Sequence, residues 1–185
     1  MLRKVDYKMN ELIFNRKSIN NYLLAIIVGL LSAPVFTSKY LAFNNIDNWS
    51  TLIPQGIAIF LACEYVCTIR RSYNFIVIRN YELQAFVALV IFNVFIFSFN
   101  YGTIFLVSFC LGAKLGTGLV VKLTLLIILG KYLILLIDSV LIALLFNSQK
   151  IWVIITLVIA ITYFYHYYVE RLIFGVQFIN LILKG

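Results

Sequence analysis

Residues 119–146 read LVVKLTLLIILGKYLILLIDSVLIALLF, and this stretch decides the fold class. A helix needs about 20 mostly apolar residues to cross the hydrocarbon core of a bilayer, and this stretch is longer than that. The strands of a transmembrane β-barrel alternate apolar and polar residues over about 10 positions, whereas this stretch shows no such alternation. It therefore predicts a membrane-spanning helix and an all-α fold.

The composition of the whole chain supports this prediction. Of its 185 residues, 63% are hydrophobic and 12% are charged, whereas soluble domains have about 45–50% and about 25%. A soluble fold of this size would lack the polar groups to cover its surface, which excludes a soluble enzyme, a disordered protein and a secreted cysteine-rich scaffold. We expect a multi-pass protein of the cell membrane, with residues 1–185 forming a single transmembrane domain.

Apolar stretches on both sides of residues 119–146 predict six membrane segments in total. Their predicted bounds are residues 22–43, 52–69, 83–112, 119–146, 151–169 and, for a shorter sixth segment, 172–183. The third stretch is long enough to contain a break at Asn100, Tyr101 and Gly102. It could form one span, or a span followed by a re-entrant piece.

The basic residues predict the orientation of these segments. With six spans, one side of the membrane carries ten of them: Arg3, Lys4, Lys8, Arg16, Lys17, Arg70, Arg71, Arg79, Lys150 and Lys184. The other side carries three: Lys39, Lys114 and Arg171. Loops rich in Lys and Arg stay in the cytoplasm, so both termini are predicted to lie inside. This asymmetry accounts for most of the formal net charge of +8, and we expect no nucleic-acid partner.

Residue types that usually carry catalysis or bind cofactors are sparse. Cys63, Cys67 and Cys110 are the only cysteines, and His166 is the only histidine. Cys63 and Cys67 share a helix face, but two thiolates without a third ligand make a poor metal site. A cysteine nucleophile needs a nearby base, and the predicted topology places Cys67 and His166 near opposite membrane surfaces. Residues 112–118 are glycine-rich but lack the Gly-Lys-Ser/Thr ending of a phosphate-binding loop. We therefore predict no metal, no cofactor and no enzymatic activity.

Apart from Lys39 and Lys122 near span ends, three charged residues lie within the predicted spans: Glu64, Lys131 and Asp138. Charges at membrane depth are costly and usually face a cavity or a partner. Lys131 and Asp138 are seven residues apart, which places them on one helix face with a rise of about 10 Å between them. Each is expected to meet a group on another helix or on a second subunit, either as a structural contact or as part of a transport path. Glu64 is expected to reach towards Arg70 and Arg71 at the membrane surface.

Two further segments are basic and amphipathic. Residues 1–20 mix apolar side chains with Lys8, Glu11, Arg16 and Lys17, and such a segment can lie in the cytoplasmic interface of the membrane. Residues 70–82 connect the second and third predicted spans and combine three arginines with aromatic side chains.

These two segments, with six spans and both ends inside, resemble the small membrane subunits of ABC-2-type ABC transporters, especially those of Gram-positive peptide and bacteriocin export or immunity systems. The resemblance implies that residues 1–20 form the interfacial elbow and that residues 70–82 form the coupling segment. It also implies a separate ATP-binding subunit and pairing with a second copy or a homologous permease. The residues expected to dock the ATPase are Arg70, Arg71, Tyr73, Arg79 and Glu82.

Three functions remain open from the sequence. The first is the permease subunit of an ATP-driven exporter for a peptide or another amphipathic substrate. The second is a membrane immunity or accessory protein that binds a toxin or a partner complex without transport. The third is the substrate-binding membrane subunit of a vitamin-type importer, although the predicted outer side offers few polar groups for a pocket: Asn44, Asn45, Asp47, Asn48 and Trp49.

Overall fold

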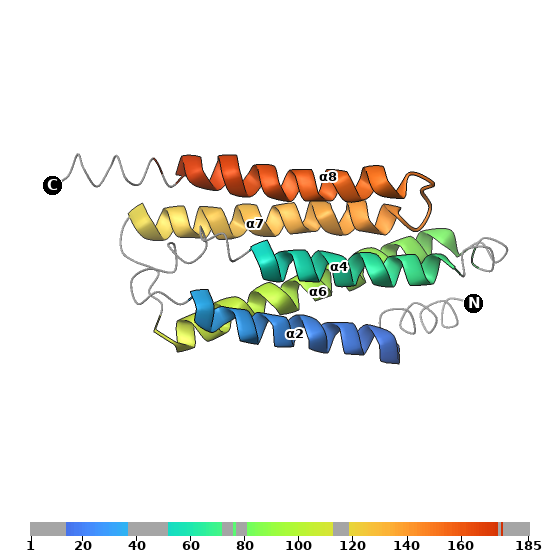
Figure 1. The fold of residues 1–185 in the computed structure, drawn as a ribbon, viewed down its shortest axis with the longest axis horizontal. Coiled ribbons are helices and arrows are strands. Elements are labelled where there is room, and N and C mark those ends of the chain that lie inside the picture. The colour runs from blue at the N-terminus through green and yellow to red at the C-terminus, as the bar shows by residue number, and fades with distance from the viewer. Residues whose placement is uncertain are drawn as a thin grey trace.

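The computed structural model describes residues 14–36, 52–71, 76, 81–112, 119–173 and 175. These residues are almost entirely helical and none of them lies in a strand, which confirms the all-α class. The helices run back and forth along a common direction (Figure 1). Their bounds are α2 (Arg16–Phe36), α4 (Leu52–Arg70), α6 (Glu82–Cys110), α7 (Leu119–Leu144), α8 (Ile151–Phe164) and the π-helix η2 (Tyr165–Glu170).

The lengths and hydropathy of these helices indicate a membrane protein. In the part of the chain that the structure describes, four helices are long and apolar enough to cross a bilayer: Leu52–Arg70, Glu82–Cys110, Val121–Leu144 and Ile151–Ile173. Large hydrophobic side chains cover much of the outside, including Leu31, Phe60, Leu106 and Trp152, which are 65–80% exposed. Such a surface suits contact with lipid rather than water.

The first described helix begins earlier than the sequence predicts. Residues 16–20 belong to α2, although they were expected in the interfacial segment before the first span. The reason is a helix cap: Asn15 Oδ1 accepts a hydrogen bond from the backbone N–H of Ser18 at 2.8 Å, as an N-cap side chain does. Residues 1–13 of the predicted elbow lie outside the described residues.

The break considered at Asn100, Tyr101 and Gly102 does not occur. Helix α6 is continuous over its 29 residues. The polar groups in this stretch find partners on neighbouring helices, because Asn100 Nδ2 donates to Ala25 O of α2 at 3.0 Å and the Tyr101 hydroxyl donates to Gln55 Oε1 of α4 at 2.8 Å. Asn100 Nδ2 and the Tyr101 hydroxyl therefore bond to neighbouring helices without any change in the helical backbone of α6.

The predicted turn between the fifth and sixth segments is wrong. The helix continues from α8 through η2 to Ile173, so Glu170 and Arg171 lie inside a helix rather than in a loop. A contact stabilises each charge within the helix. Glu170 pairs with Lys131 of α7, and the Arg171 guanidinium lies 5.1 Å from the centre of the Tyr167 ring. Most of the predicted sixth segment, residues 176–183, falls outside the described residues.

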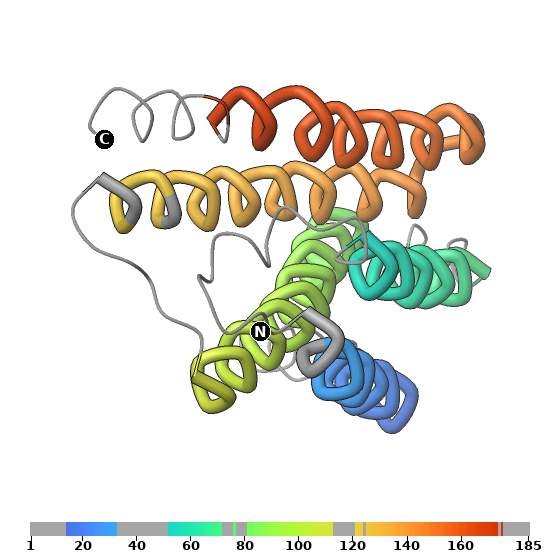
Figure 2. Tube along the Cα trace, turned by 60° about the vertical axis from the view of Figure 1, so that its left-hand side comes forward, coloured from blue at the N-terminus to red at the C-terminus, as the bar shows by residue number. Residues whose placement is uncertain are grey.

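Helix α6 is the centre of the packing. The Phe92 ring of α6 stacks on Tyr65 of α4 with 3.9 Å between ring centroids and lies 5.1 Å from Tyr22 of α2. On its other side α6 contacts α7, where Asn93 Nδ2 donates to Ser139 O at 3.0 Å. Helices α7 and α8 lie side by side as a hairpin above the group formed by α2, α4 and α6 (Figure 2). Two sets of helices therefore meet along α6 and α7.

Candidate functional site

Three titratable side chains form a buried cluster where η2 packs on α7. Lys131 Nζ lies 3.1 Å from Glu170 Oε1, and His166 Nδ1 lies 2.7 Å from Glu170 Oε2. Lys131 and His166 are each 4% exposed and Glu170 is fully buried. We call Lys131, His166 and Glu170 the buried ionic cluster.

The local structure around this cluster depends on a π-helix and a glycine. The π-helical segment η2 carries both His166 and Glu170, and π-helical turns are frequent at functional sites. The Tyr165 hydroxyl donates to Ile127 O of α7 at 3.1 Å, which joins η2 to α7 beside the cluster. Gly130 makes this approach possible, because a Cβ atom at that position would overlap the Tyr165 hydroxyl.

The electrostatics of the cluster are those of a buried ion pair, Lys131 and Glu170, in an apolar setting. A lone charge near the bilayer centre costs about 2.5–3.5 kcal/mol on insertion scales. Glu170 faces the Lys131 ammonium with one oxygen and His166 with the other. His166 Nδ1 and Glu170 Oε2 share a hydrogen bond at 2.7 Å. Chemically, the arrangement can hold one positive and one negative charge inside the bundle and place an imidazole next to them.

A second polar contact joins α7 and α8 two helical turns along from the cluster. Thr162 Oγ1 donates to Asp138 Oδ2 at 2.9 Å, and Asp138 is fully buried. Lys131 and Asp138 therefore both meet groups on the helix that follows α7, which is the interhelical contact expected from the sequence.

An apolar groove lies beside the buried ionic cluster, between α6 and α7. It has a volume of about 630 Å³, and its surface is almost entirely apolar. Its walls include Tyr101, Gly102 and Phe105 of α6 and Leu125, Leu129 and Lys131 of α7. Pockets of about 300–1,000 Å³ with apolar walls and a few polar groups are typical of sites for small organic ligands. The groove therefore has the size and lining of a ligand site, with a charged group in its wall.

Glu64 does not make the contact expected from the sequence. Its Oε1 lies 2.7 Å from Lys17 Nζ of α2, so it joins α4 to α2 instead of reaching Arg70 or Arg71. Both partners are more than 40% exposed, and such exposed pairs contribute about 0–1 kcal/mol. Thr68 also accepts a hydrogen bond from Lys17 Nζ, at 2.9 Å.

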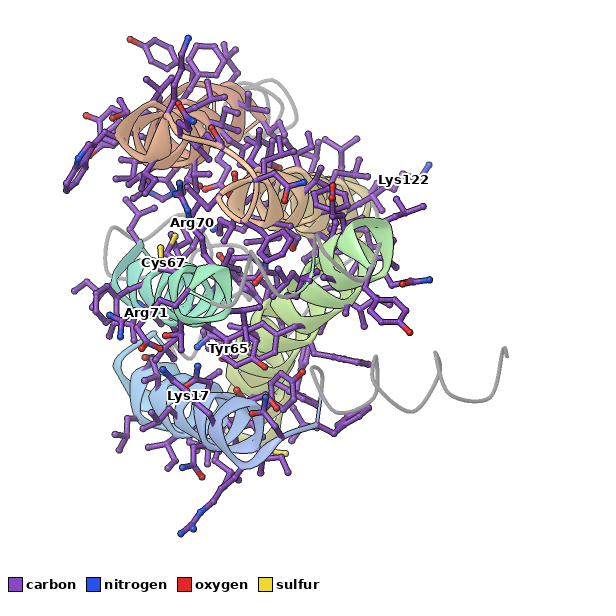
Figure 3. The ribbon with its side chains drawn as sticks, turned by 90° about the vertical axis from the view of Figure 1, so that its right-hand side faces the viewer. Lys17, Tyr65, Cys67, Arg70, Arg71 and Lys122 are labelled. Carbon is purple, nitrogen blue, oxygen red and sulfur yellow. The ribbon has the colours of Figure 1, made fainter. Side chains whose placement is uncertain are left out.

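The residues expected to dock an ATPase lie partly within the described chain. Arg70 ends α4, Arg71 follows it in a turn, and Glu82 begins α6 at the same end of the bundle. Figure 3 looks onto this end, where Arg70, Arg71 and Lys17 are labelled. Tyr73 and Arg79 fall outside the described residues.

The cysteines do not contact His166. Cys63 and Cys67 are partly buried on α4, Cys110 is exposed at the end of α6, and all three are free thiols. His166 contacts Glu170 rather than a thiol. Among the described residues, no group of three or more His, Cys, Asp or Glu side chains could hold a metal ion.

Sequence reasoning missed two members of the buried ionic cluster. Glu170 was expected beside a turn, and His166 was considered as a base for cysteine chemistry but not as a partner of Glu170. Their spacing of four residues, which places two side chains on one helix face, is the signal that could have joined them.

No protein-family model matches the chain, and no curated protein or solved structure matches it significantly.

Proposed function

We propose that this protein is the membrane subunit of a transport system that moves a peptide or another amphipathic substrate across the cell membrane, with the energy supplied by a separate ATPase. The observation that carries the proposal is the buried ionic cluster of Lys131, His166 and Glu170, of which Lys131 also lines the apolar groove. Ionisable residues inside a membrane are rare and mark substrate or ion pathways. If the ion pair served stability alone, apolar side chains of similar volume would stabilise the fold equally well or better.

The distribution of basic residues supports an orientation for this subunit. Outside the middle of the helices, the described end with the start of α2 carries Arg16, Lys17, Arg70, Arg71 and Lys150, and the opposite end carries Lys122 and Arg171. The positive-inside rule assigns the richer end to the cytoplasm. An ATPase would then dock there, on the segment that contains Arg70, Arg71, Tyr73, Arg79 and Glu82, and this subunit would catalyse no reaction itself.

The test is purification of the tagged protein from its native host in a mild detergent. We expect an ATP-hydrolysing subunit to co-purify with it. The double variant Arg71→Glu, Arg79→Glu should lose that subunit, because a positively charged docking surface becomes negative. Lys150→Glu is the matched control, since it reverses one charge at the same end of the bundle in a different connection, and it should retain the ATPase.

The alternatives make different predictions for the same experiment. An immunity or accessory protein would purify with its toxin or its partner complex and would work without an ATPase. The substrate-binding subunit of an importer would purify with its small-molecule substrate. Recovery of an active protein without any ATPase would overturn the permease proposal.

A further inference from the structure

We propose that Asp138 is a proton-binding site inside the membrane, and that its carboxyl group holds an exchangeable proton on Oδ1 in the assembled bundle. The ligand of this site is the proton itself. The inference goes beyond the proposed function and does not depend on it, because neither an ATPase nor its docking surface takes part.

Asp138 is fully buried in an apolar part of the bundle. Leu135 and Ile142, about one turn before and one turn after it on α7, belong to the hydrophobic core. Its Oδ2 accepts a hydrogen bond from Thr162 Oγ1 of α8 at 2.9 Å, whereas its Oδ1 is buried and has no hydrogen-bond partner among the described residues. One oxygen of this carboxyl group therefore lacks the partner that a buried carboxylate requires.

No positive charge stands beside Asp138 to balance an ionised carboxylate. Within the described chain no ion pair includes Asp138, and helix α8 contains no charged residue. Lys131, the nearest cation on the same helix, is about 10 Å of rise away and pairs with Glu170. The titratable groups of other helices that interact electrostatically with Asp138 are Cys63 of α4 and Tyr101 of α6, and neither can carry a positive charge. An ionised Asp138 would therefore be an unpaired charge.

A proton balances this site more simply than a metal ion does. A buried ionisable group without a counterion takes its neutral form instead of keeping the charge. A proton needs one oxygen, and Oδ1 is free to take it, whereas calcium and magnesium ions need about six or more ligands. The hydroxyl of Thr162 suits both forms of the carboxyl group, since a hydroxyl can donate a hydrogen bond or accept one.

Glu170 provides a comparison within the same bundle. It is as deeply buried as Asp138, yet Lys131 Nζ lies 3.1 Å from one of its oxygens and His166 Nδ1 lies 2.7 Å from the other. The two carboxyl groups therefore differ in their partners and not in their burial. We expect Glu170 to be ionised and Asp138 to be protonated.

The position of Asp138 along α7 allows its proton to exchange with water. Asp138 lies six residues before Leu144, the last residue of α7, which corresponds to about 9 Å of rise. Carboxyl groups inside membranes form the proton relays of pumps and transporters. Because loss of this proton would place a charge between α7 and α8, the pH at the end of the bundle that holds Ser148 should bias how these two helices pack.

Infrared spectroscopy of the purified full-length protein measures this proton directly. The solvent is dodecyl maltoside, because this detergent has no carbonyl group, and a protonated carboxyl group absorbs at a higher wavenumber than the amide bands. We expect this absorption at about pH 6, where an aspartate in water is ionised because its pKa is about 3.9. In heavy water the band should move to lower wavenumber as deuterium replaces the proton. The proposal fails if the band is absent, or if heavy water does not move it.

Isotope labelling and a substitution assign the band. It should move when the aspartate carboxyl groups carry carbon-13 and stay in place when glutamate is labelled instead. The chain has three aspartates, Asp6, Asp47 and Asp138, and Asp138→Asn should lose the band. Glu64→Gln is the matched control, since this carboxyl group is more than 40% exposed and pairs with Lys17, and it should keep the band. A band that moves with labelled glutamate contradicts the proposal even if Asp138→Asn does not fold, and so does a band that persists in a folded Asp138→Asn.

Thr162→Val tests the geometry of the site. It removes the hydroxyl that donates to Oδ2 and retains a side chain of similar shape. The band should keep its area and move to higher wavenumber, because a hydrogen bond to a carbonyl oxygen lowers its stretching frequency. An unchanged wavenumber would assign the proton to another carboxyl group and overturn the proposal.

Discussion

The buried charge of Lys131 or of Glu170 would destabilise the fold if it stood alone, whereas the two charges together offset each other. Both side chains are at least 96% buried, and each supplies the charge that offsets the other at 3.1 Å. The general experience with buried ion pairs is that removing one partner is strongly destabilising, whereas replacing both with apolar groups is often neutral or better. We therefore expect that replacing both residues changes the free energy of unfolding little, whereas replacing only one lowers it strongly.

We expect Lys131→Met to lower the free energy of unfolding by about 3–5 kcal/mol, because the Glu170 charge is left in the bundle without its counterion. The double variant Lys131→Met, Glu170→Met should recover most of this loss. Denaturant unfolding in detergent micelles measures both. Lys122→Met is the control, since Lys122 is exposed on the same helix and should change stability little. A double variant that loses as much as the two single variants summed would show that the residues act independently.

Two helices approach closely at Gly130, and the close approach defines how η2 sits on α7. A Cβ atom there would overlap the hydroxyl of Tyr165, whose hydrogen bond to Ile127 O joins the two elements. Gly102 on α6 is also a helical glycine, but a Cβ atom at that position meets nothing within 4 Å. The two glycines therefore differ in their surroundings and not in their secondary structure.

Gly130→Ala should destabilise the protein by about 1–3 kcal/mol, as overpacking in a filled interior does. Gly102→Ala should be neutral or stabilising by up to about 1 kcal/mol, because Ala favours a helix more than Gly does. Thermal unfolding of the two variants side by side gives the comparison. Equal melting temperatures would show that α7 and η2 separate without cost at this point.

The helices were predictable from the sequence, and their contacts were not. Apolar length alone identifies α4, α6 and α7, because a bilayer requires about 20 such residues whatever the neighbours are. Glu170 and Arg171 look like a loop in the sequence, since charges normally end a span. The helix continues through them because Lys131, 39 positions earlier (170 − 131), supplies the partner. The partner of Glu64 was not predictable from the sequence either, because it is Lys17 of α2 and not the nearby Arg70.

At the scale of the whole molecule, successive described helices alternate in direction, so their ends gather at two ends of the bundle (Figure 1). We propose that the end that holds Ser148 and Arg71 faces the cytoplasm, because it is richer in Lys and Arg. Cys110 and the end of η2 lie at the opposite end. The orientation can therefore be tested with one native thiol and one introduced thiol.

A variant that retains only Cys110 should be labelled by an impermeant thiol reagent added to intact cells, because this exposed cysteine faces outwards in the assigned orientation. A cysteine-free variant with Ser148→Cys should be labelled only after the membrane is permeabilised. Accessibility is read from the mass shift of the purified protein. Labelling of Ser148→Cys in intact cells with none at Cys110 would reverse the orientation.

The hairpin of α7 and α8 has a consequence for the order in which the chain is made. Lys131 and Asp138 leave the ribosome before their partners do, because Glu170 follows Lys131 by 39 residues and Thr162 follows Asp138 by 24. At about 5–20 residues per second, the wait for Glu170 is about 2–8 s. During that time α7 carries two charges that nothing on α8 can yet offset. The two helices should therefore settle in the bilayer as one unit, and a nascent chain arrested before residue 162 should hold α7 less firmly in the membrane than one arrested after residue 173.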